Sequence, residues 1–142
     1  ERNTNFFTLG PRVDYRALDW LTLTLTYLYE RGLADGHKDT QFADDVSYYL
    51  HMVSAGTEVR INRQWDLGFT YIHRRKTFTS GLAGDTHVGR FDATHQGIAE
   101  LRYHMSAAAT VMLSFQYGKR TSTNALRDFQ DSILSIGGQY RF

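Results

Sequence analysis

Apolar and polar residues alternate with a period of two along most of the chain. In the clearest run, Leu21, Leu23 and Leu25 are separated by threonines, and Tyr27 and Tyr29 continue the series. A helix would spread these side chains around its axis, whereas a strand places them all on one face. The alternation predicts an all-β domain of seven strands without a helix. The predicted strands cover residues 5–17, 21–31, 46–61, 65–78, 94–105, 109–120 and 131–142.

The segments between the predicted strands alternate in length. Short turns are expected near residues 17–19, 62–64 and 106–108, and long polar segments cover residues 32–45, 79–92 and 121–128. Short turns at one end and long loops at the other are typical of an up-and-down antiparallel transmembrane β-barrel, with its turns in the periplasm and its loops outside the cell.

The polar positions of the predicted strands carry full charges. In a soluble ligand-binding barrel the interior is mostly apolar and the charges lie outside, whereas a membrane barrel has lipid on its apolar face and water on its charged face. The alternation leaves both assignments open, and the lengths of the connections favour the membrane barrel. The predicted lumen-lining residues are Arg12, Asp14, Arg16, Glu58, Arg60, Asp66, Glu100, Arg102 and Arg141.

Composition narrows the function classes. A chain of 142 residues is enough for one domain, and its formal net charge of +1 gives no reason to expect a nucleic-acid partner. The absence of cysteine excludes disulfides and thiolate metal sites. The apolar runs are far shorter than the ~20 residues of a membrane-spanning helix.

The last predicted strand alternates up to the end of the chain. Leu134, Ile136, Tyr140 and Phe142 occupy its apolar positions. This strand resembles the terminal strand of porin-like β-barrel proteins of the Gram-negative outer membrane, whose last residue is typically Phe. The resemblance implies a location in the bacterial outer membrane, a bilayer containing lipopolysaccharide, and recognition of these four residues by the barrel-assembly machinery.

The same resemblance places Phe142 in the periplasm, so the first predicted strand would start outside the cell. Single-chain bacterial barrels have an even number of strands with both termini in the periplasm. We therefore expect these residues to be the C-terminal part of a larger barrel. The alternative is a complete eight-stranded barrel in which one strand escapes the pattern.

Aromatic and basic residues gather near the expected strand ends. Two aromatic girdles are predicted, with ordinary cross-strand packing as the alternative. Basic residues at the loop ends would either pair with lipopolysaccharide phosphates or form a solvated rim, and only the direction in which they face decides. The girdle residues are Trp20 and Trp65 near the turns and Tyr27, Tyr29, Tyr71 and Tyr117 toward the loops. The basic residues are Arg31, Arg74, Arg75, Lys76, Lys119 and Arg120.

Candidate catalytic and metal sites are weak. His104 and Ser106, with Glu100 nearby, are superficially similar to the His-x-Ser pair of outer-membrane lipid A deacylases, but they fall at a predicted turn and Ala107 follows. We therefore expect a turn serine and no enzyme. The acidic residues Asp35, Asp39, Asp44 and Asp45 lack the spacing of a calcium loop, and the six histidines lack zinc-ligand spacing. No metal or cofactor is expected.

These features predict an outer-membrane channel or export conduit for polar solutes or polymer. The near balance of the two signs of charge predicts weak ion selectivity. The alternative is a barrel that acts as a sheath or scaffold for a protein partner, such as an electron-transfer cytochrome or a secretion component. An outer-membrane hydrolase and a soluble ligand-binding barrel are weaker hypotheses.

Overall fold

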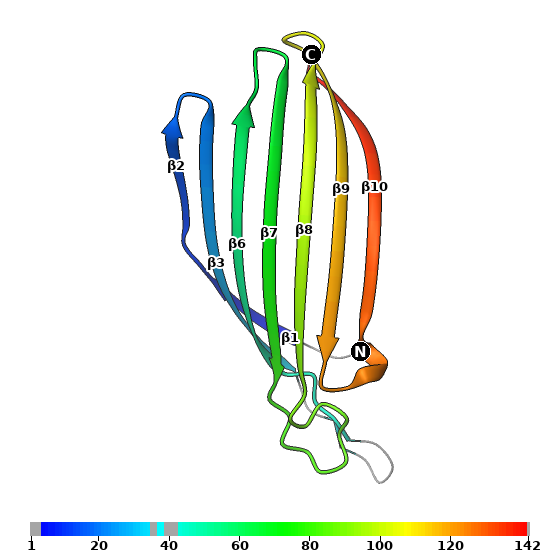
Figure 1. Cartoon of the computed structure of the whole chain (residues 1–142). Coiled ribbons are helices and arrows are strands. Elements are labelled where there is room, and N and C mark those ends of the chain that lie inside the picture. Colours follow the sequence, from blue (N-terminus) through cyan, green and yellow to red (C-terminus); the bar gives the residue numbers. More distant parts are fainter. Residues whose placement is uncertain (1–3, 35–36, 39–42, 142) are drawn as a thin grey trace.

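The computed structural model describes residues 4–34, 37–38 and 43–141, and Figure 1 shows their arrangement. Almost all of the regular structure is β-strand, and the one exception is a short 3₁₀ turn, η1 (Ala125–Arg127). The long strands are β3 (Leu21–Ala34), β6 (Tyr48–Arg60), β7 (Trp65–Phe78), β8 (Phe91–His104), β9 (Ala109–Ser122) and β10 (Phe129–Tyr140). The shorter ones are β1 (Thr4–Leu9), β2 (Arg12–Leu18), β4 (His37–Lys38) and β5 (Ala43–Asp44).

Eight of the described strands form one antiparallel sheet in the order β1, β3, β6, β7, β8, β9 and β10, with β2 also paired to β3, and β4 and β5 form a separate two-stranded sheet. The prediction of an all-β, up-and-down antiparallel architecture is therefore confirmed. Among the described strands, β1 and β2 form one edge and β10 forms the other, and these two edges are not paired with each other. The sheet is open, and closure into a barrel is not observed.

The predicted first strand, residues 5–17, is divided into β1 and β2. Leu9 pairs with Tyr29 and Arg12 pairs with Thr26, so both segments keep the same register against β3. The interruption comes from Gly10 and Pro11, because proline has no amide proton to donate to the ladder. A β-bulge near Arg16 and Leu18 then shifts the register by one residue before the turn.

The remaining boundaries shift by a few residues. The strand expected over 94–105 starts at Phe91, the strand expected over 131–142 starts at Phe129, and β3 extends to Ala34. The short hairpin of β4 and β5 lies in the segment 32–45, where only a loop was expected. These additions all lie at the loop end, where polar strand extensions do not show the alternation of the middle of the sheet.

The short turns and the long loops lie at opposite ends of the sheet, as predicted (Figure 1). Two of the turns are closed by side chains: Asn62 Oδ1 accepts the amide protons of Gln64 and Trp65, and Ser106 Oγ accepts those of Ala108 and Ala109. Such bonds from Asn and Ser are a common reason for a chain to reverse at these residues.

The two faces of the sheet differ in chemistry, as the alternation predicts. One face, here called the apolar face, carries Leu, Phe, Val and Tyr side chains that remain open to the surroundings. Among the described residues, Phe78 is the only buried hydrophobic residue. The sheet therefore has no hydrophobic core of its own, and most of its apolar surface is available to an environment outside the chain.

Candidate functional site

The predicted lumen-lining residues share the second face of the sheet, here called the charged face. Residues paired across neighbouring strands point to the same side. The register joins Asp14 to Thr24 and Thr22 to Glu58, and it aligns Arg60, Asp66 and Arg102 in one row. Arg141 follows β10 directly, and its side chain lines a hollow of about 250 Å³ with Arg102 and His104.

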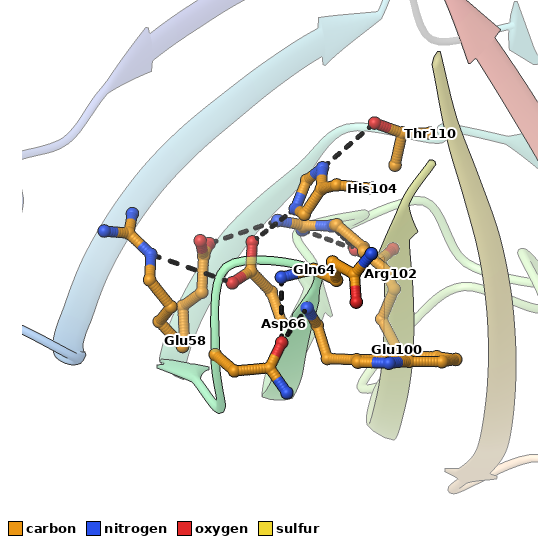
Figure 2. Close-up of polar contacts among 10 residues, drawn as sticks. Glu58, Gln64, Asp66, Glu100, Arg102, His104 and Thr110 are labelled. Atoms are coloured by element: carbon orange, nitrogen blue, oxygen red, sulfur yellow. Dashed lines mark hydrogen bonds and ion pairs between the residues drawn. The ribbon is translucent and has the colours of Figure 1, made fainter. Parts of the chain in front are cut away.

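Arg102 lies at the centre of a three-residue ion cluster that joins β6 and β8 across β7 (Figure 2). Its Nη1 is 3.2 Å from Glu58 Oε2, and it also donates to Glu100. Gly68 lies between Glu58 and Glu100 in the register, on β7. Because Gly68 has no side chain, β7 places no group between the two glutamates in this row, and Arg102 donates to both carboxylates.

A second cluster joins Asp66, His104 and Thr110 beside Arg102 (Figure 2). His104 Nε2 is 2.7 Å from Asp66 Oδ2, and His104 Nδ1 is 3.0 Å from Thr110 Oγ1. With the proton on Nε2, His104 donates to Asp66 and accepts from the Thr110 hydroxyl. Asp66 is 8% exposed, and Arg60 Nε lies 3.9 Å from its other oxygen. The alternation places His104 on the same face as Arg102, but the sequence did not predict its hydrogen bond to Asp66.

The hypothetical pair of His104 and Ser106 does not form. The contacts of His104 go to Asp66 and Thr110, and Ser106 accepts backbone amides of its own turn. A serine nucleophile requires a base within hydrogen-bond reach of its hydroxyl. The geometry therefore matches the expected role of Ser106 as a turn residue.

A groove of about 430 Å³ crosses the charged face between the threonines of β3 and the ion cluster. At its edge, Arg12 Nε lies 2.9 Å from Asp14 Oδ2, and Thr24 donates its hydroxyl to Asp14 at 2.7 Å. Ion pairs between exposed side chains contribute little to stability. The main consequence of this arrangement is therefore a hydrophilic surface on which the two signs of charge alternate.

At the loop end, the carboxylate of Asp85 ties two loop segments together. Its Oδ2 accepts the Ser80 hydroxyl at 2.5 Å and the Asp45 amide at 2.7 Å, and its Oδ1 accepts the His87 amide at 2.9 Å. Burial alone would raise the pKa of Asp85, but these hydrogen bonds outweigh it and hold the pKa well below its usual range. The sequence pattern does not single out Asp85, because its partners come from segments about 40 residues apart.

We expect Asp85→Asn to loosen both segments. The substitution removes a buried charged acceptor, at a local cost of about 2 kcal/mol, and amide exchange at Asp45 and His87 should accelerate ~30-fold. Because the folded pKa is depressed, the stabilisation is complete above the ordinary pKa of ~3.9 and declines as the pH falls below it. Hydrogen exchange followed by mass spectrometry between pH 3 and 7 measures both effects.

Thr86→Ala, at an exposed neighbouring position, serves as the control and should exchange like the unmodified chain. Equal protection of Asp45 and His87 in the Asp85→Asn variant would show that the carboxylate does not organise these loops.

Of the acidic residues considered as calcium ligands, Asp35 and Asp39 lie outside the described residues. In the described part of the chain, no group of three His, Asp or Glu residues is arranged to hold a metal ion. Within that same part, no helix is long and apolar enough to cross a membrane. Comparisons of the chain with protein-family models, with curated proteins and with solved structures found no match.

Proposed function

We propose that this chain forms part of the wall of an outer-membrane β-barrel channel, with its apolar face toward lipid and its charged face toward a water-filled lumen. The observation that carries the proposal is the segregation of the two faces. On the apolar face, Leu25, Phe115 and Ile136 are 54%, 47% and 79% exposed, and no described residue of its strands is Asp or Glu. Hydrocarbon is the surrounding in which such a face is stable.

The dimensions of the strands support this proposal. From Trp65 to Arg75, β7 rises about 26 Å at a tilt of ~40°, so these two residues would lie at the two interfaces of an apolar band of ~25 Å. Trp65 and Tyr103 lie at the turn end of that band, with their ring centroids 4.6 Å apart. Tyr27, Tyr71 and Tyr117 lie toward the loop end on the same face, where the second aromatic girdle is expected.

The open edges of the sheet require partners in this setting. Unpaired backbone groups do not occur in contact with hydrocarbon, so β2 and β10 must pair with further strands in the membrane. Leu134, Ile136 and Tyr140 of the proposed assembly signal share the apolar face, and Phe142 lies outside the described residues. In this proposal, β10 carries the residues that the assembly machinery recognises.

Conductance tests the proposal. The purified protein, carrying all of its strands, should produce stepwise ion currents in planar bilayers. Glu58→Gln with Glu100→Gln leaves Arg102 unbalanced and should raise the anion-to-cation permeability ratio about two- to fivefold. Arg102→Gln should shift the reversal potential in the opposite direction and is the matched control of opposite sign.

Two results would contradict the channel. The first is an inserted protein that conducts no ions, which would instead support a sheath that holds a partner. The second is a conducting protein whose reversal potential is the same in the unmodified protein and in both variants. The charged face would then not line the path of the ions.

A further inference from the structure

The apolar face changes its chemistry over its last rows toward the loop end. There, Tyr27, Tyr71 and Tyr117 give way to cations and histidines. The register places His73, His95 and Lys119 in one row and His51 with Arg75 in the next. We call Arg31, His51, His73, Arg75, His95 and Lys119 the basic band.

The basic residues of the strand ends divide between the two faces. Arg31, Arg75 and Lys119 are exposed on the apolar face, and in the described part of the chain none of them forms an ion pair. Their sequence neighbours Arg74, Lys76 and Arg120 lie on the charged face. Carboxylates share that face with them: the register places Lys76 in one row with Glu30 and Asp92, and Asp92 also interacts with Arg120. In addition, Arg74 Nε donates to Met52 Sδ, and Arg120 Nε donates to Arg127 O.

Charge complementarity therefore calls for an anion beside the basic band. The described strand residues of the apolar face contribute three permanent cations and no carboxylate, so nothing within this face neutralises them. Arg31 lies over Tyr49 and Arg75 over Phe91, with guanidinium carbons 5.3 Å from the ring centroids. These contacts hold the guanidinium groups along the surface and leave their donors available.

An apolar groove of about 500 Å³ opens directly beneath the basic band. Phe69 and Tyr71 line one side and Phe115 and Tyr117 the other, with Gly97 and the small side chain of Ala99 between them. A Cβ added at Gly97 would meet no atom within 4 Å, so the space over it is open. The Tyr71 hydroxyl lies 2.6 Å from His95 Nδ1 and joins the groove to the band.

We infer that the basic band and this groove together bind a phosphorylated lipid of the surrounding leaflet. Arg75 and Lys119 pair with the phosphate, assisted by His95, and one acyl chain lies along Gly97 between the aromatic walls. Guanidinium and ammonium groups are strong partners for phosphate. The rows of Lys119 and Arg75 lie about 21 and 26 Å above Trp65, near the height of a headgroup. The inference rests on the proposed membrane location and names a partner for it, and it does not require an open pore.

Native mass spectrometry of the protein in detergent micelles tests the inference with diphosphoryl lipid A as the probe. Arg31→Gln with Arg75→Gln and Lys119→Gln should weaken binding on the order of 30-fold or more. The matched control, Arg74→Gln with Lys76→Gln and Arg120→Gln, removes the same charge at the same height from the other face and should bind within about twofold of the unmodified protein. Gly97→Phe should fill the groove and weaken binding without a change of charge.

Further probes separate the lipid from its phosphate. Dephosphorylated lipid A should bind about tenfold more weakly than the diphosphoryl form, and millimolar inorganic phosphate should not displace the lipid. Equal loss in the two triple variants, equal binding of the dephosphorylated lipid, or full displacement by inorganic phosphate would overturn the inference. A protein that conducts but shows no phosphate preference overturns this inference alone, whereas one that binds the lipid but stays closed overturns only the channel.

Discussion

Replacing Leu113 by arginine is expected to lower the free energy of unfolding of the membrane-inserted protein by about 2–4 kcal/mol, the cost of a cation on the lipid-facing side near the bilayer midplane. Leu113 is 43% exposed in the middle of β9 and pairs with Leu101 and Ile136 on the apolar face. An arginine there has no carboxylate within its face to pair with. The same change at Ser114 should alter the free energy of unfolding by about 0.5 kcal/mol or less, because Ser114 pairs with Glu100 on the charged face.

Urea unfolding in phospholipid vesicles, followed by the fluorescence of Trp20 and Trp65, measures both variants. Leu113 and Ser114 are adjacent in β9, so they lie on opposite faces of the sheet at nearly the same depth in the bilayer. A difference between the two variants therefore reports the face and not the depth. A larger loss for Ser114→Arg than for Leu113→Arg would reverse the assignment of the faces. The charged face would then lie outside and the apolar face inside, as in a soluble ligand-binding barrel.

The alternation of side chains predicted most of the sheet, because each strand has two faces of different polarity and a period of two is visible in a single sequence. The run from Leu21 to Tyr29 and the turns near residues 63 and 107 illustrate this, since both depend on neighbours in the chain. Closure depends instead on pairing between distant strands. The alternation is the same in an open sheet and a barrel, which is why closure could not be read from it.

The sequence predicted which charged residues share one side of the sheet, but not which of them form hydrogen bonds and ion pairs with one another. The alternation of side chains along each strand is enough to place Glu58, Asp66 and Arg102 on one side of the sheet. The pairing of Arg102 with Glu58, or of His104 with Asp66, depends on the register between strands and on the absence of a side chain at Gly68. Neighbouring residues of a strand point to opposite faces, so the alternation along β7 also predicts that Arg75 and Arg74 lie on different faces of the sheet.

Gly10 lies where the strand predicted over residues 5–17 is interrupted, and a substitution at this position is expected to have a large effect on stability. A Cβ at this position would lie 2.0 Å from the Tyr27 carbonyl oxygen and 2.8 Å from Leu28 Cα. Both atoms belong to the backbone of β3, so no side-chain rotation can relieve the overlap. We expect Gly10→Ala to separate the edge strand from β3 near this point and to lower the free energy of unfolding by about 2–4 kcal/mol.

Gly97→Ala is the matched control for Gly10→Ala, because it makes the same change in a strand where the added Cβ meets no atom within 4 Å. Its effect on the free energy of unfolding should stay within about 0.5 kcal/mol. Urea unfolding measures the global loss, and hydrogen exchange over residues 4–9 and 29–34 shows whether β1 detaches first. Equal stability of the two variants would mean that β1 and β2 move freely relative to β3. The close approach at Gly10 would then place no constraint on this edge, and the bend at Gly10 and Pro11 would be open to any residue.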